Sequence, residues 1–553
     1  MQTIIIVPAC RSGARRAGPR YPGSAPPIEE FAIALFDSPG AKLGPKSLWN
    51  RLTAHMEPPV FFGSALLVVA FVVAGAVFTT EAGEVFSAIQ GEITAAFGWW
   101  YMLAATGFLV LAGAILVSPL RRVRLGGADA KPEFSFLSWC AMLFAAGMGT
   151  GLVFFSVAEP FTHYIDPPPG IEARTETAAR EAMRISFFHW GLNAWGIYLV
   201  LALAVAYLHF NRDLPLAPRS VLEPLFGRTV MEGWAGHAVD TLCVVGTLLG
   251  VSTSLGLGAM QINTGLNELA GIERSTLVQI ILIASITALA TVSVVLGVKG
   301  GIRRLSQTNL ILAGLLFAFV FLAGPTVTIL ETFTASLGRY LQDLPRATLM
   351  VDFTGENEWR SNWTLFYWGW WISWAPFVAI FLARVSKGRT IGETIVVALL
   401  VPTLATFAWL AVFGGAGLNI ERFGDGLPDI IAEEPALALH ALLDTLPFAP
   451  VTMGLATLVI LLFFVSSSDS GSLVDDMVTS GGDPHPPRAQ RVFWAVSEGA
   501  VAIALLLAGG LTAIRNAAIS LGLPMSIVLA LAGAALVKIM VSERGRAALS
   551  KAD

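Results

Sequence analysis

Long apolar segments alternate with short polar connections along almost the whole chain. Twelve of these segments reach or approach the ~20 residues that a helix needs to cross a bilayer. They cover residues 59–79, 97–118, 136–162, 184–209, 238–266, 274–297, 308–324, 362–384, 391–416, 450–470, 492–510 and 519–541. Strands of a membrane barrel would be only ~10 residues long, with strict alternation of apolar and polar positions. The pattern therefore predicts an all-α membrane protein with 12 transmembrane helices.

The positions of the basic residues predict how these helices are oriented. Loops on the cytoplasmic side of a membrane are enriched in Lys and Arg. Alternate loops carry basic clusters, as at residues 121–124, whereas the loops between them carry fewer, and the loop over residues 417–449 is acidic. We therefore expect a multi-pass protein of the cell inner (plasma) membrane. Residues 1–56 are expected to form a cytoplasmic N-terminal tail, and residues 542–553 a short cytoplasmic C-terminal tail.

The composition excludes several other classes of protein. Of the 553 residues, 55% are hydrophobic and 13% are charged, against about 25% charged in soluble domains. A soluble enzyme, a disordered chain and a secreted disulfide scaffold are all excluded, because too little polar surface is present. The net charge of −4 gives no sign of nucleic-acid binding. We find no nucleophile–base or metal-ligand motif and do not expect an enzyme.

Two of the predicted spans contain glycine or proline where a regular helix would be interrupted. Span 136–162 contains GMGTG at residues 147–151, and span 362–384 contains WWISWAP at residues 370–376. Transporters often build their sites at such interruptions. Close helix packing is the alternative explanation of the glycines, although glycines at a spacing of two do not share one helix face.

The two interrupted spans divide the chain into two sets of five helices. An odd number of helices per set gives the two sets opposite orientations in the membrane, as in an inverted-repeat transporter. The predicted units are two extra N-terminal helices (57–118), a first repeat (119–324), an outer amphipathic helix and loop (325–361) and a second repeat (362–541).

Aromatic residues are concentrated in two of the predicted helices. Five of the 15 tryptophans lie within residues 363–374, and a second group consists of Trp190, Trp195 and Tyr198. Membrane tryptophans often belong to the interfacial belt, but Trp371 lies too far inside its span for that explanation. Aromatic rings together form boxes that bind quaternary ammonium groups through their faces. These rings are therefore candidates for an onium-binding site.

Five segments together resemble the betaine/carnitine/choline transporter (BCCT) family. They are AAGMGTGLVFFSVAEPFTHY (145–164), FFHWGLNAWGIY (187–198), GTLLGVSTSLGLGAMQINTGL (246–266), WTLFYWGWWISWAPFVAIFLARVSKGRTIGE (363–393) and LLFFVSSSDSGS (461–472). The resemblance covers about residues 55–540. It implies a LeuT-type 5+5 inverted-repeat core in helices 3–12, a homotrimer, and import of a small onium solute with sodium by alternating access. Glycine betaine is the first candidate, with dimethylsulfoniopropionate, choline, carnitine and ectoine as alternatives.

The resemblance also assigns residues to the substrate site. By position, the family's aromatic box falls on Trp190, Trp195, Tyr198 and Trp371. Trp374 matches a tryptophan that lines the cytoplasmic path, and Trp370 matches one that stacks nearby. Beside the box, we expect the substrate to meet Met148, Gly149 and Gly151.

Sodium is the expected coupling ion, and no other cofactor is expected. The resemblance implies one sodium site formed by Ala145, Met148, Phe463, Ser466 and Ser467, and a second formed by Thr247 and Phe377.

Two positions bear on the choice of coupling ion. Val251 stands where the sodium-coupled pattern has a second threonine, and neither Ser252 nor Thr253 is in register to replace it, which puts a second sodium in doubt. Proton-coupled relatives tend to carry Asp where this chain has Gly151. Sodium symport is therefore favoured over a sodium-independent exchanger or a proton-coupled choline-type transporter.

Four isolated polar residues lie within apolar segments. We interpret Glu159 as a structural group that satisfies loosened backbone, with a gating role as the alternative, and His189 as a hydrogen-bonded buried histidine. Asp469 is expected to cap a helix or to pair at a cytoplasmic gate. Asp240 is expected to cap the start of its helix.

Overall fold

The computed structural model describes residues 56–147, 149–296, 299–350, 358–483 and 486–549. Within these ranges the regular secondary structure is helical, joined by turns and loops, and an isolated antiparallel bridge pairs Arg124 with Thr390. The long helices are α4 (Pro58–Val77), α5 (Thr79–Val117), α6 (Phe136–Gly147), α7 (Thr150–Ile165), α8 (Glu176–Trp190), α9 (Leu192–Arg212), α12 (Trp234–Ala270), α13 (Thr276–Leu296), α14 (Lys299–Ala323), α15 (Thr326–Ala347), α17 (Phe366–Val385), α18 (Ile391–Phe423), α20 (Ala449–Thr479), α21 (Arg488–Leu507) and α22 (Leu511–Leu549).

Shorter helices connect these long ones. They are η1 (Pro119–Arg122), η2 (Pro218–Leu222), α10 (Glu223–Phe226), α11 (Arg228–Met231), α16 (Glu358–Arg360), η3 (Ser361–Leu365), η4 (Asp429–Ala432), η5 (Pro435–Leu437) and α19 (Ala438–Asp444).

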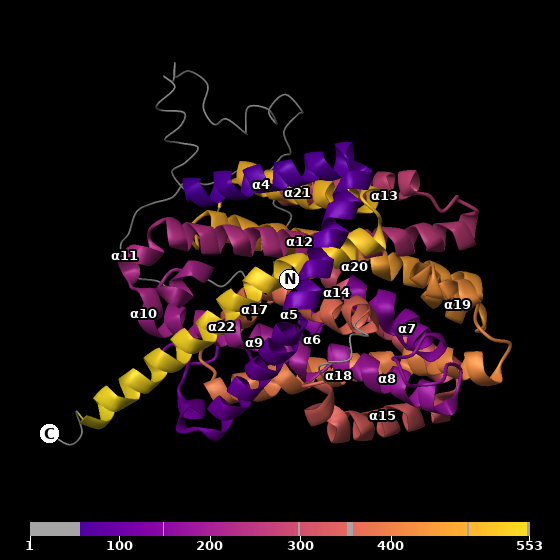
Figure 1. The fold of residues 1–553 in the computed structure, drawn as a ribbon, viewed down its shortest axis with the longest axis horizontal. Helices are drawn as coiled ribbons and strands as arrows, with labels where there is room; N and C mark the ends of the chain where they lie inside the picture. The colour runs from indigo at the N-terminus through magenta and orange to yellow at the C-terminus, as the bar shows by residue number, and fades with distance from the viewer. Residues whose placement is uncertain (1–55, 148, 297–298, 351–357, 484–485, 550–553) are drawn as a thin grey trace, which may run out of the picture.

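The helices pack in layers around α12, α17 and α20 (Figure 1). Helices α4, α13 and α21 cover one side of α12, whereas α8, α15 and α18 lie together on the opposite side of the molecule. Helix α5 packs against α22, and α17 lies between α9, α12 and α22.

Ten helices of the described chain are long and apolar enough to cross a membrane. This confirms an all-α membrane protein, although it gives two fewer spans than the 12 predicted. Span 136–162 is absent from the ten because it is divided into α6 and α7. Of span 274–297, the described residues provide only a shorter apolar helix.

One of the two predicted helix interruptions is present. Helix α6 ends at Gly147 and α7 begins at Thr150, with Gly149 extended between them at φ −157° and ψ 177°. The interruption predicted at residues 370–376 is wrong, because α17 continues through Pro376. Proline removes one N–H donor from a helix, and neighbouring helices let a buried membrane helix tolerate this loss.

The amphipathic helix expected within residues 325–361 is α15. Its buried side chains include Ile329, Ser336 and Tyr340, and it packs against α8 and α18. On the other side, polar side chains such as Glu331 and Gln342 are exposed, together with the apolar Val327 and Leu330. This two-sided distribution is typical of an amphipathic helix.

Close backbone contact holds α17 against α22. A methyl group built on Gly369 would lie 2.7 Å from the Cα atom of Ile519, and one built on Gly522 would lie 2.7 Å from the Cα atom of Gly369. Backbone atoms cannot move aside as the end of a side chain can. Small residues at such crossings let membrane helices approach closely.

We expect the Gly369→Ala substitution to destabilise the protein. Added volume at a close contact typically costs ~1–3 kcal/mol, so the melting temperature of the detergent-purified protein should fall by several degrees. Gly314→Ala is the matched control, because no atom lies within 4 Å of the methyl group it would add. Equal melting temperatures for the two variants would contradict this account of the crossing.

Candidate functional site

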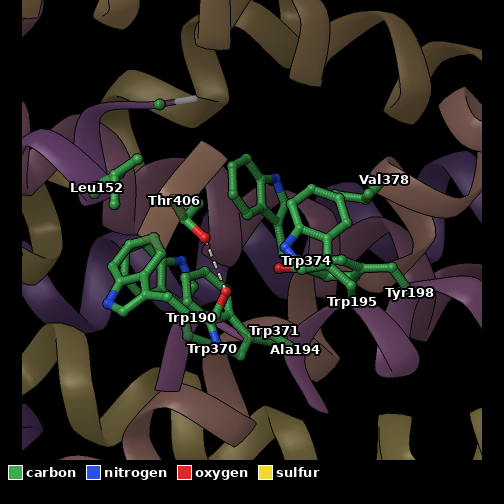
Figure 2. A pocket seen from close by; sticks show the side chains of 12 residues that line it. Leu152, Trp190, Ala194, Trp195, Tyr198, Trp370, Trp371, Trp374, Val378 and Thr406 are labelled. Carbon is green, nitrogen blue, oxygen red and sulfur yellow. Dashed lines mark hydrogen bonds between the residues drawn. The ribbon is translucent and has the colours of Figure 1, made fainter. Parts of the chain in front are cut away.

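A cavity lies where α7, α9, α17 and α18 meet the end of α8. Figure 2 shows indole rings from α8, α9 and α17 gathered around it together with Tyr198. The residues that line the cavity are Gly149, Gly151, Leu152, Trp190, Ala194, Trp195, Tyr198, Trp370, Trp371, Trp374, Val378 and Thr406. None of these lining residues is charged, so the cavity offers mainly aromatic faces to a ligand.

The four rings assigned to the aromatic box all line this cavity. The ring centroids of Trp190 and Trp371 lie 4.9 Å apart at an interplanar angle of 68°. Tyr198 makes angles of 73° with Trp371 and 75° with Trp195, at centroid distances of 6.3 and 5.5 Å. Rings set at steep angles to their neighbours can present faces to a common ligand from several directions.

A break between α8 and α9 brings the rings of these two helices to the same cavity. The apolar pattern predicted one span here, but the helix is interrupted at Gly191, where φ is −93° and ψ is −149°. A methyl group on Gly191 would lie 2.7 Å from the Tyr340 hydroxyl. That hydroxyl accepts a hydrogen bond of 2.9 Å from the backbone N–H of Leu192. The amphipathic helix α15 thus stabilises the break through Tyr340.

Two glycines of the GMGTG motif, Gly149 and Gly151, have different surroundings. Both line the cavity, but only Gly151 lies against an indole ring, and a methyl group there would overlap the ring of Trp370. Around Gly149 the corresponding space is open. Met148 lies outside the described residues. Packing room for Trp370 is therefore a structural reason for glycine at position 151.

Trp370, Trp374 and Phe377 form a stack that leads away from the box. Trp370 and Trp374 lie 6.4 Å apart at 12°, and Trp374 and Phe377 lie 5.5 Å apart at 5°. Trp374 lines the first cavity, and Phe377 lines a second cavity that Arg384 also borders. These stacked rings therefore lie between the two cavities.

The sequence analysis missed Leu152, Ala194, Val378 and Thr406. The hydroxyl of Thr406 donates hydrogen bonds to the carbonyl groups of Trp190 (3.2 Å) and Thr403 (2.9 Å), so this residue holds the end of α8 against α18. Small and aliphatic residues in apolar spans carry no sequence signal that separates cavity lining from core packing.

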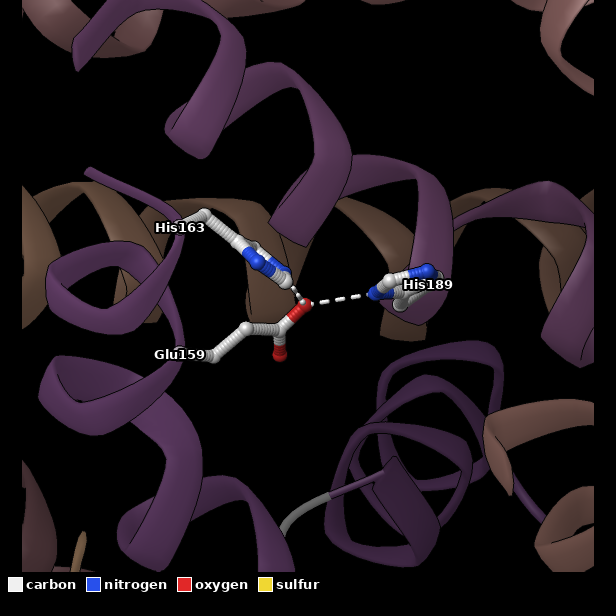
Figure 3. A group of neighbouring side chains, drawn as sticks. All are labelled: Glu159, His163 and His189. Carbon is white, nitrogen blue, oxygen red and sulfur yellow. Dashed lines mark hydrogen bonds and ion pairs between the residues drawn. The ribbon is translucent and has the colours of Figure 1, made fainter. Parts of the chain in front are cut away.

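Glu159 forms a buried polar network beside the box. Its carboxylate lies between His163 and His189, as Figure 3 shows. It also accepts hydrogen bonds from the indole N–H of Trp190 (2.9 Å) and the hydroxyl of Tyr367 (2.5 Å). The expectation that Glu159 satisfies loosened backbone is therefore wrong, because its partners among the described residues are side chains. His189 is a buried, hydrogen-bonded histidine, as expected.

The described residues assigned to the first sodium site lie on α6 and α20. The hydroxyl of Ser466 donates to the carbonyl of Phe463 at 3.1 Å, and Ser467 is half-buried on the same helix, α20. This helix contacts α7. Ala145 is in α6, but its side chain and all of Met148 lie outside the described structure.

The residues of the second assigned sodium site lie in α12 and α17, which pack together. The Thr247 hydroxyl is buried and has no hydrogen-bond partner among the described residues, and Phe377 is also buried. Val251 packs against α20, where a methyl group on Gly471 would lie 2.6 Å from it. Position 251 therefore supplies an apolar surface where the sodium-coupled pattern has a hydroxyl.

The two hydroxyls next to Val251 are used in helix packing. Ser252 donates to the carbonyl of Glu498 on α21 at 2.9 Å, and Thr253 donates to the carbonyl of Leu249 one turn earlier, also at 2.9 Å. Both hydroxyl protons therefore have backbone acceptors.

Two expectations about isolated aspartates need correction. Asp240 does not cap its helix, because α12 begins at Trp234. Its carboxylate accepts a hydrogen bond of 2.7 Å from the backbone N–H of Arg219 in the neighbouring turn η2. Asp469 does not cap a helix end either, because α20 continues to Thr479.

Comparison with known proteins identifies similar chains along nearly the full length. A family model described as "BCCT, betaine/carnitine/choline family transporter" matches residues 59–545. An uncharacterized transporter of Mycobacterium tuberculosis is 48% identical over 87% of this chain and 82% of its own length. A glycine betaine/proline/choline transporter of Vibrio parahaemolyticus is 41% identical over 92% and 93% of the two chains. The glycine betaine transporter OpuD of Bacillus subtilis is 42% identical over 88% and 94%.

These comparisons confirm the resemblance found in the five sequence segments. The matched family and the named relatives are transporters and not enzymes, which confirms the expectation that this chain is not an enzyme.

We expect Gly151→Ala to disturb the cavity and Gly149→Ala to leave it intact. A methyl group at position 151 would overlap Trp370, whereas a methyl group at position 149 would meet open space. Gly151→Ala should lower the melting temperature by several degrees and change the tryptophan emission spectrum of the purified protein. If both variants behave alike, glycine at position 151 is not required by the packing of Trp370.

Proposed function

The chain belongs to the betaine/carnitine/choline transporter family, and from this membership we propose that it imports a small onium solute with sodium. The first candidate is glycine betaine. Dimethylsulfoniopropionate, choline, carnitine and ectoine share the relevant chemistry and are the alternatives. The process is secondary active transport by alternating access, in which the sodium gradient drives an osmoprotectant solute into the cell.

The observation that carries this proposal is the aromatic cavity. A quaternary ammonium or sulfonium group has no N–H to donate, so a carboxylate in the site would gain no hydrogen bond from it. Aromatic faces attract such a cation by their quadrupoles, at about 0.5–2 kcal/mol for each ring. Trp190, Tyr198 and Trp371 are 6%, 3% and 3% exposed, so the cation would bind to them largely out of water.

We propose that the architecture follows the LeuT-type plan of two inverted five-helix repeats. The 12 spans would be α4, α5, α6 with α7, α8 with α9, and then α12, α13, α14, α17, α18, α20, α21 and α22. The interruption between α6 and α7 supports this arrangement, because it opens the first repeat at the aromatic cavity. Both termini would be cytoplasmic in the plasma membrane. A homotrimer is part of the same proposal.

We propose that one sodium ion binds near Ser466 and Ser467 of α20. Hard cations prefer oxygen ligands, and α20 offers these two hydroxyls with the carbonyl of Phe463. The second site, at Thr247, would be weaker, because Val251 replaces a hydroxyl with an apolar side chain.

Uptake by the purified protein in liposomes tests the transport proposal. Radiolabelled glycine betaine should accumulate with an inward sodium gradient at fixed membrane potential, and Trp371→Ala should abolish this accumulation because it removes one wall of the box. Trp234→Ala is the matched control, because Trp234 is 83% exposed and is not among the residues that line the cavity.

Three outcomes would change the proposal. Equal uptake with and without sodium would reject sodium coupling in favour of exchange or proton coupling. Full activity of Trp371→Ala would reject the aromatic box. No uptake of betaine would direct the same assay to choline, carnitine and dimethylsulfoniopropionate.

The sodium assignment makes a separate prediction. Ser466→Ala should raise the sodium concentration for half-maximal uptake about ten-fold, equivalent to ~1.4 kcal/mol, whereas Thr247→Ala should raise it less than about three-fold. The measurement is initial uptake at saturating substrate over a series of sodium concentrations. A larger effect at Thr247 than at Ser466 would reverse the ranking of the two sites.

A further inference from the structure

The carboxylate of Glu159 lies directly behind one wall of the aromatic box. This side chain is fully buried, at 0% exposure, and its two oxygens face four polar groups. Oε1 lies 2.6 Å from Nδ1 of His189 and 3.5 Å from Nε2 of His163. Oε2 accepts hydrogen bonds from Nε1 of Trp190 (2.9 Å) and from the hydroxyl of Tyr367 (2.5 Å).

The hydrogen bonds of this network extend to two tryptophans of the box, Trp190 and Trp371. Trp190 is bonded to Glu159 itself, and the indole N–H of Trp371 donates to the backbone carbonyl of His189 at 3.0 Å. The ring of Tyr367 lies 5.6 Å from the rings of both Trp190 and Trp371. One carboxylate and its partners therefore fix the edges of two rings whose faces line the cavity.

The set of donors around Glu159 favours the ionised carboxylate. An indole N–H can only donate, and an ionised carboxylate can only accept. Hydrogen bonds to an ionised acceptor are roughly twice as strong as neutral ones. No lining residue of the cavity is acidic. Glu159 would therefore act on a bound cation from behind the cavity wall, through its hydrogen bond to the Trp190 indole.

A metal ion is a poorer explanation of the three side chains in Figure 3. The ligand atoms of Glu159, His163 and His189 do lie within 4.8 Å of one another. However, ligands about 2.1 Å from a tetrahedral zinc ion are separated by about 3.4 Å, and Oε1 and Nδ1 lie only 2.6 Å apart. The other carboxylate oxygen already accepts two hydrogen bonds. The distances are those of a hydrogen-bonded network.

We infer that Glu159 is a positioning residue that tunes the box for a cation. It fixes the rings of Trp190 and Tyr367 by hydrogen bonds. Its negative charge, at the N–H edge of Trp190, also polarises the indole so that the ring face becomes more negative and a stronger partner for an onium group. This inference rests on the proposed function and adds to it the source of the selectivity for a positive headgroup.

The test compares two ligands that differ in one atom of the headgroup. Glycine betaine carries a trimethylammonium group, and 3,3-dimethylbutanoate carries an uncharged tert-butyl group of similar shape. Binding of each ligand to the purified full-length protein is measured by tryptophan fluorescence. We expect the wild type to bind betaine at least about ten-fold more tightly. In Glu159→Gln this ratio should fall about five-fold, because the shape is kept and the charge is lost.

Two further variants separate charge from geometry. Tyr367→Phe removes a hydrogen-bond donor and Glu159→Asp moves the carboxylate, but both keep the charge. They should weaken both ligands by a similar factor and leave the ratio unchanged. If Glu159→Gln weakens both ligands equally and also leaves the ratio unchanged, the role of Glu159 is structural and the inference is overturned.

A second measurement does not depend on a substitution at Glu159. In protein labelled with ¹⁵N-indole tryptophan, the Trp190 N–H resonance is assigned by its loss in Trp190→Phe. It should lie downfield, as for an indole bonded to a carboxylate, and a resonance at the position of an unbonded indole would overturn the inference. Failure of the wild type to bind either ligand would instead reject the proposed function, whereas tight betaine binding with a ratio near one would reject only the role of Glu159.

Discussion

The aromatic cavity depends on how closely α17 approaches its neighbours. This helix carries Trp370, Trp371 and Trp374, and large rings need room that only glycine leaves on the facing helices. Trp370 lies against Gly151 of α7, and Trp374 lies about 3.1 Å from the position of a methyl group on Gly250 of α12. Protein interiors are packed too densely to absorb added atoms at such contacts. The size and shape of the cavity follow from these few close contacts.

A second constraint is that polar groups within the bilayer need partners inside the protein. Each unsatisfied group in hydrocarbon costs several kcal/mol. Two indole N–H groups of the box, those of Trp190 and Trp371, meet this requirement with acceptors that do not line the cavity. Trp371 donates to the carbonyl of His189, which the helix end at Gly191 leaves available, and Trp190 donates to Glu159. The rings can therefore turn apolar faces toward the ligand while their polar edges are bonded behind it.

The stack of rings along α17 links the cavity to a second one on the same helix. Trp374 borders the first cavity and Phe377 the second, and their rings are nearly parallel at 5°. Under the proposed alternating-access mechanism, these stacked rings would form an aromatic barrier directly beside the cavity. The break between α6 and α7 lies at the same cavity, so extended backbone and aromatic side chains meet there.

The sequence alone determined the class of protein, the position of most helices and the residues of the aromatic box. The class and the helix positions depend on local apolar length, whereas the four box residues, which lie on α8, α9 and α17, were assigned by the resemblance of short aromatic-rich segments. It could not determine that Pro376 lies inside a continuous helix, that Gly191 interrupts another, or that Glu159 bonds Trp190 and Tyr367. Each of these outcomes depends on partners from distant parts of the chain, such as Tyr340 beside Gly191. Only tertiary packing decides which backbone and side-chain groups find such partners.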